Sequence, residues 1–99
     1  MSDLTRTDVI KLIAIATKPL NLIGVDLSGV DLSGLDLYKA ILSKANLSGA
    51  ILKGTDLGGA YLYEADLTNT DLSRTGLTGA DLTGVKGYKQ WLQRERDTS

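Results

Sequence analysis

The side chains that could carry chemistry in this chain of 99 residues are carboxylates, tyrosines and lysines. The sequence contains neither cysteine nor histidine, which excludes disulfides, thiolate nucleophiles, histidine bases, Ser-His triads and the usual zinc ligand sets. Aspartates recur with a regular spacing, each directly before a leucine: Asp26, Asp31, Asp36, Asp56, Asp66, Asp71 and Asp81. Two such carboxylates about 5 Å apart would suit a retaining glycosidase or a calcium ion.

The same spacing indicates which element must position these carboxylates. Thirteen consecutive five-residue units, from residues 20–24 to 80–84, carry Leu at the third position without exception. A period of five matches neither a helix nor a strand, so each unit is expected to be a short extended piece plus a corner. Mostly small residues stand two places before Leu, as the interior of a narrow tube requires. The sequence therefore predicts an all-β solenoid over residues 20–85.

The two flanking segments, residues 1–19 and 86–99, have helical patterns. Thr5 and Asp8 have the spacing of a capping box, and the apolar residues that follow predict a helix ending near Thr17. Tyr88 and Trp91 belong to a second, shorter stripe, which is followed by a charged tail over residues 94–97. A solenoid exposes apolar side chains and unpaired edges at its ends, so both segments are expected to be capping helices.

The net charge of -1 hides an uneven distribution. Residues 20–85 hold eight acids against four bases, whereas residues 86–99 hold four bases against two acids. The acidic walls oppose direct nucleic-acid binding. The longest apolar stretch, residues 12–16, is far below the length of a membrane span, and Asp8 and Lys11 interrupt what would resemble a signal sequence. These features favour a cytoplasmic protein without membrane contact.

Several units also match a known repeat. Residues 25–29 (VDLSG), 45–49 (ANLSG) and 80–84 (ADLTG) match the pattern A(D/N)LXX almost letter for letter, and through them the chain closely resembles the pentapeptide repeat family. The resemblance implies a right-handed quadrilateral β-helix with four units per coil, and therefore about three coils for these thirteen units. It also implies that Leu and the residue two places before it point inward, and that residues twenty apart stack.

That stacking assigns the outward residues to four walls. Face 1 carries Asn21, Ile41, Tyr61 and Asp81 before the leucines, and Ile23, Ser43, Tyr63 and Thr83 after them. At the position before leucine, face 2 carries Asp26, Asn46 and Asp66. Face 3 carries Asp31, Ile51 and Asp71 there, and face 4 carries Asp36, Asp56 and Gly76. Only Asp36 and Asp56 then stack as two carboxylates. Aspartates without such a partner recur in other units, so accepting backbone hydrogen bonds at corners explains all of them. No catalytic, cofactor or metal site is expected.

Face 1 departs most from the repeat pattern. Ile23, Ile41, Tyr61 and Tyr63 occupy outward positions, although they are apolar or aromatic, and stacking gathers them on one wall. An exposed apolar patch rimmed by polar residues is typical of a protein contact surface, and tyrosine is enriched there. The alternative is that a terminal segment covers this wall and makes it ordinary core. These four residues are the candidate contact site for an unknown protein partner or for self-association.

The sequence therefore favours a non-enzymatic structural or protein-interaction module. The resemblance also suggests an alternative, a DNA mimic that binds a type II topoisomerase, as some pentapeptide repeat proteins are understood to do. The length opposes that alternative, because thirteen units make about 16 Å of solenoid against about 34 Å for one turn of duplex DNA. The acids are also too sparse to imitate a phosphate backbone.

Overall fold

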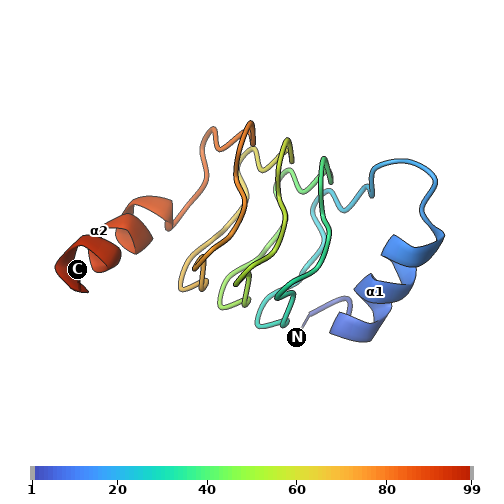
Figure 1. The fold of residues 1–99 in the computed structure, drawn as a ribbon, viewed down its shortest axis with the longest axis horizontal. Coiled ribbons are helices and arrows are strands. Elements are labelled where there is room, and N and C mark those ends of the chain that lie inside the picture. Colours follow the sequence, from blue (N-terminus) through green and yellow to red (C-terminus); the bar gives the residue numbers. More distant parts are fainter. Residues whose placement is uncertain (1, 99) are drawn as a thin grey trace.

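The structure is a computed structural model that describes residues 2–98, with side chains through residue 95. Helix α1 (Arg6–Ile15) precedes a solenoid, and helix α2 (Tyr88–Thr98) follows it. The coils stack side by side between the two helices, giving a particle whose longest dimension is 40 Å (Figure 1). The predicted order of helix, solenoid and helix is the order that the structure has.

Backbone pairing repeats every twenty residues, so one coil contains four units. On face 1, parallel bridges join Asn21 to Ile41, Ile41 to Tyr61, and Tyr61 to Asp81. The Leu22 N–H donates to the Ile41 carbonyl at 2.7 Å, and the Ile41 N–H donates to the Leu20 carbonyl at 2.8 Å. The predicted stacking is confirmed. Each wall contributes a single bridged residue per coil, so in the described chain isolated bridges take the place of extended strands.

The tube is filled by leucine and by small side chains, as the large-and-small pattern predicts. The repeat leucines from Leu22 to Leu72 are at most 4% exposed. Ala40, Ala45, Ala50, Ala60 and Ala65 are equally buried beside them. Threonine takes the place of alanine at three positions, 55, 70 and 75. Their hydroxyls donate to backbone carbonyls: Thr55 to Leu32 at 2.8 Å, Thr70 to Leu67 at 2.8 Å and the half-buried Thr75 to Leu52 at 2.6 Å. The polar groups inside the tube therefore have partners.

At the N-terminal end the first coil is joined to the chain that precedes it. The predicted capping box is present: the Asp8 N–H donates to Thr5 Oγ1 at 3.1 Å, and the Thr5 N–H donates to Asp8 Oδ2 at 2.9 Å. α1 ends at Ile15, two residues before the predicted end. Val9 is fully buried against the core. The Asp3 N–H donates to the Asp26 carbonyl at 2.6 Å, and this bond extends the backbone pairing beyond the first coil.

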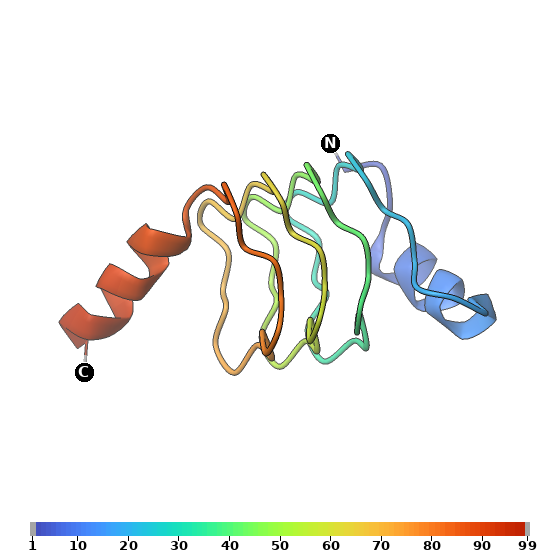
Figure 2. The same ribbon diagram turned by 90° about the horizontal axis from the view of Figure 1, so that it is seen from above.

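The C-terminal end is more open. α2 leads away from the last coil in both views (Figures 1 and 2), and Tyr88 and Trp91 contact the core from its first turn. Leu77 and Leu82 in the last coil are only half-buried. The predicted charged tail belongs to α2, although the side chains of residues 96 and 97 lie outside the described residues. Within residues 2–98, neither helix combines the length and hydrophobicity that a membrane span requires.

Candidate functional site

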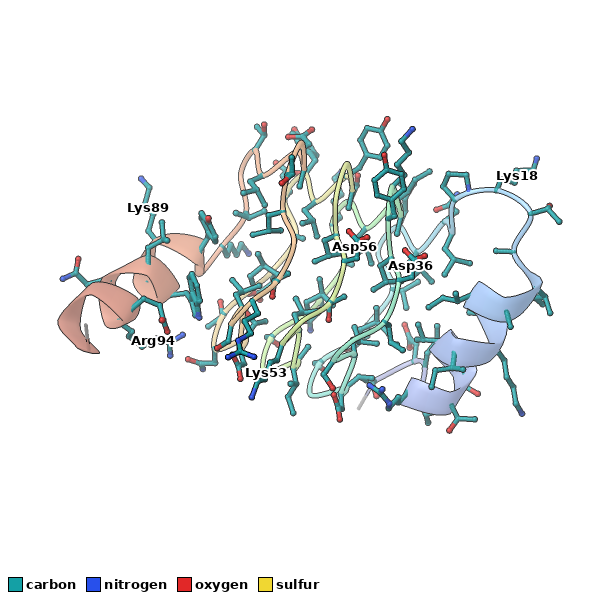
Figure 3. All side chains as sticks on the ribbon, in the orientation of Figure 1. Lys18, Asp36, Lys53, Asp56, Lys89 and Arg94 are labelled. Carbon is teal, nitrogen blue, oxygen red and sulfur yellow. The ribbon has the colours of Figure 1, made fainter. Side chains whose placement is uncertain are left out.

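The stacked carboxylates Asp36 and Asp56 lie on adjacent coils of face 4 (Figure 3), joined by a parallel backbone bridge. Asp36 Oδ1 accepts the Tyr38 N–H at 3.1 Å, and Asp56 Oδ1 accepts the Gly58 N–H at 2.9 Å. Each carboxylate is thus used by the backbone of its own unit, which is the structural role that the sequence predicts. Across the described residues, no group of three acidic, histidine or cysteine side chains is placed to hold a metal ion.

The same short hydrogen bond recurs along face 2. Asp26, Asn46 and Asp66 each accept the N–H two residues later at 2.9 Å. Hydrogen bonds from Thr68 hold the pKa of Asp66 below its ordinary value, and the bond from the Thr68 side chain has a larger effect than the bond from its backbone. Asparagine performs the same task at Asn46 without a charge. These residues therefore fix corners of the tube.

The four candidate residues of face 1 lie together on one wall and reach solvent. Ile23 is 53% exposed, Tyr61 52% and Tyr63 43%, while Ile41 is half-buried between them. The bridges from Asn21 through Ile41 and Tyr61 to Asp81 place these side chains on successive coils. α1 and α2 lie at the two ends of the tube, and within residues 2–98 neither covers this wall (Figures 1 and 2).

Face 1 also lacks part of the corner hydrogen bonding that face 2 has. Ile41 and Tyr61 stand at the repeat position where Asp or Asn normally accepts an N–H, so Ser43 and Tyr63 have no side-chain acceptor there. Such a bond contributes about 1 kcal/mol. Since Tyr61 remains exposed, burial does not offset the loss. A local rule that is broken without compensation is expected at functional sites.

The corners beside face 1 contain residues that the sequence analysis missed. The fifth residue of every unit has a left-handed backbone, and eight of the thirteen are glycine. Lys39, Lys44 and Glu64, with φ of 60°, 61° and 56°, adopt this conformation at a cost of roughly 1 kcal/mol each relative to glycine. They stand at the two edges of face 1. The recurrence of glycine at the fifth position was the signal that could have identified them.

Tyr38 is a further residue that the sequence analysis did not select. It lies at the corner between faces 4 and 1 and is 55% exposed. A Cβ atom on Gly58, one coil further, would lie 3.1 Å from its ring, so Gly58 leaves the space that the ring uses. The Lys39 ammonium lies 5.4 Å from the ring centre. This corner adds an aromatic and a cationic group to the edge of face 1.

Two hollows lie at the ends of the tube. One of about 300 Å³ lies between the segment after α1 and the end of the first coil, where Lys18, Asp36 and Lys39 are among its lining residues. The other, of about 530 Å³, lies where the chain passes from Leu82 into α2. Both are broad openings at the tube ends, and the candidate residues of face 1 line neither of them.

Comparisons with known proteins agree with this geometry. The family model for pentapeptide repeats matches residues 21–54 and 50–86, with eight copies of the model's repeat. A pentapeptide repeat protein from the thylakoid lumen of Arabidopsis thaliana is 35% identical, with a TM-score of 0.54; the match covers 70% of this chain and 55% of that one. Another, from the cyanobacterium Cyanothece 51142, is 35% identical, with a TM-score of 0.42 and coverage of 70% and 44%. No curated protein matches the sequence.

The chain thus spans about half the length of these two solved structures. The match to the thylakoid protein supports a right-handed β-helix, the handedness that the sequence resemblance implied. Pentapeptide repeat proteins are generally structural or binding modules. Because the family model covers well over half of the residues, this chain belongs to the pentapeptide repeat family.

Proposed function

We propose that this protein is a non-enzymatic protein-interaction module and that its contact surface is face 1, centred on Ile41 and Tyr61. The observation that carries the proposal is the pair of substitutions on adjacent coils. Both positions exchange a corner acceptor for an apolar or aromatic side chain, and Tyr61 still faces solvent. Tyr61 gains no burial in return for the lost acceptor, so a contact outside the chain is the better explanation.

The composition of face 1 also supports a protein as the partner. Tyrosine offers a large rigid contact area with a polar tip, and it is among the residues that dominate binding energy at interfaces. Face 3 provides a contrast, because its one exposed isoleucine, Ile51, bridges Asp31 on one side and Asp71 on the other. Ile51 also replaces a corner acceptor, but it is isolated between carboxylates, whereas face 1 makes this exchange on two adjacent coils and so gathers apolar side chains into a patch.

Affinity capture from a lysate of the native cells tests the proposal. The variant Tyr61→Ser/Tyr63→Ser changes face 1, and the matched control Ile51→Ser/Lys53→Ser changes the same two repeat positions on face 3. We expect the unchanged chain and the control to retain the same specific protein, and the face 1 variant to lose it. Retention by the face 1 variant, with its melting temperature unchanged, would place the contact elsewhere and overturn the proposal.

A further inference from the structure

We infer that face 1 binds face 1 of a second copy of this chain, in an antiparallel dimer with a twofold axis between the second and third coils. The inference rests on the proposed function and identifies the partner. Face 1 has four rows, residues 20–24, 40–44, 60–64 and 80–84, held at successive coils by the bridges from Asn21 to Asp81. A twofold axis in the plane of this wall and perpendicular to the solenoid places row 40–44 against row 60–64 of the other copy.

Charge complementarity is the first argument for a second copy. Lys44 and Glu64 occupy the same corner of face 1 on adjacent coils, and both are exposed. The twofold operation places Lys44 opposite Glu64 of the second copy, and the symmetry produces this pair twice. Within the described part of the chain neither residue forms an ion pair, so both charges are available.

The direction of the Glu64 side chain keeps it apart from Lys44 of the same chain. A Cβ atom on Gly84 would lie 3.1 Å from Glu64 Cγ, so the stem of Glu64 leans over the next coil and away from Lys44. The two charges therefore do not neutralise one another within one chain. Both residues hold a left-handed backbone that glycine adopts at most of the equivalent corners.

Shape complementarity is the second argument. In the same operation, large side chains meet small ones along the wall: Tyr63 lies opposite Ser43 of the second copy, and Ile23 opposite Thr83. The centre pairs Ile41 with Tyr61 of the second copy, which buries the two side chains that lack an explanation within one chain.

The size of the wall sets the expected affinity. Four rows at about 4.8 Å and five residues at about 3.3 Å make a wall roughly 15 Å tall and roughly 16 Å wide. Its area of roughly 250 Å² is well below the ~800 Å² per partner of a standard interface. We therefore expect a weak dimer, with a dissociation constant on the order of 100 µM. Such a dimer forms where the chain is concentrated and dissociates on dilution.

Sedimentation equilibrium of the full chain from about 10 µM to about 1 mM provides the test. We expect the unchanged chain to approach the dimer mass, and Lys44→Glu or Glu64→Lys alone to weaken association more than about tenfold through like-charge contacts. Mixing these two variants in equal amounts should restore a heterodimer, since each supplies the charge that the other lacks. Lys53→Glu, on face 3 (Figure 3), is the matched control and should associate as the unchanged chain does.

The mixing experiment separates contact between chains from any effect within one chain, because Lys44 and Glu64 are neighbours in each copy. An unchanged chain that stays monomeric at about 1 mM, or variants whose mixture stays monomeric, would overturn the inference. If the chain is monomeric while capture from lysate still depends on Tyr61 and Tyr63, the dimer is wrong and the proposed function stands. If both fail, face 1 is not a contact surface.

Discussion

Faces 1 and 2 share one backbone, one period and one layer of buried leucines, yet they differ in what they show to solvent. Face 2 presents Asp26, Asn46 and Asp66, each holding its own corner by a hydrogen bond of 2.9 Å. Face 1 replaces two of those acceptors, at Ile41 and Tyr61, and keeps charged side chains at strained corners beside them. The leucine register therefore builds the tube and leaves each wall free to be structural or functional.

The largest expected effect tests what the two walls have in common. Leu62 lies beneath face 1 and Leu47 beneath face 2, and both are fully buried. Replacing either with alanine should lower the free energy of unfolding by about 2–5 kcal/mol, through lost burial and a cavity. Urea denaturation of the two variants measures this. A near-neutral result for either leucine would mean that the tube is not packed equally beneath the two walls.

Exchanging the residues at one repeat position between faces 1 and 2 should change the stability less, and in opposite directions on the two faces. Asn46→Ile removes the acceptor of the Ser48 N–H from face 2 and should cost about 1 kcal/mol, or roughly 4–8 °C in melting temperature. Ile41→Asn supplies that acceptor to face 1 and should stabilise the chain by a similar amount. Thermal unfolding followed by circular dichroism measures both. A clear loss of stability in Ile41→Asn would show that Ile41 serves the fold.

Acid should act on the carboxylates of face 2. Hydrogen bonds from Ser28 and Thr68 lower the pKa of Asp26 and Asp66 in the folded chain, so the unfolded chain takes up protons first as the pH falls. The contribution of these hydrogen bonds to folding stability is complete above the ordinary aspartate pKa of about 4. It is lost as the pH drops through the lowered pKa values of the folded chain. Asp26→Asn/Asp66→Asn keeps the acceptors without titration, and its melting temperature should fall less steeply below pH 4. An unchanged pH profile would contradict this account.

The smallest expected effect concerns the tyrosines of face 1. Tyr61→Ser/Tyr63→Ser should change the free energy of unfolding by no more than about 0.5 kcal/mol, because both side chains are largely exposed. Differential scanning calorimetry beside the face 3 control Ile51→Ser/Lys53→Ser measures this. A drop of several degrees only in the tyrosine variant would show that these side chains stabilise the folded chain.

Much of this wall could be predicted from the sequence. The unbroken leucine register determines which residues point outward, and family resemblance supplies the four units per coil that bring Ile41 next to Tyr61. The contacts of the N-terminal end could not be predicted, because the bond from Asp3 to Asp26 and that from Arg6 to Asp31 depend on how the first coil meets the preceding chain. The strained corners at Lys44 and Glu64 were predictable in principle, since glycine at equivalent positions signals a left-handed backbone.

Photo-crosslinking tests most directly the central claim that face 1 contacts protein. A photoreactive phenylalanine analogue replaces Tyr63 on face 1 or, as a control, Ser73 at the same repeat position on face 3, and concentrated lysate of the native cells is irradiated. We expect adducts from position 63 and few from position 73. If the partner is a second copy, one adduct from position 63 should have about twice the chain mass of 10.5 kDa. Equal labelling from both positions, or none from position 63, would contradict it.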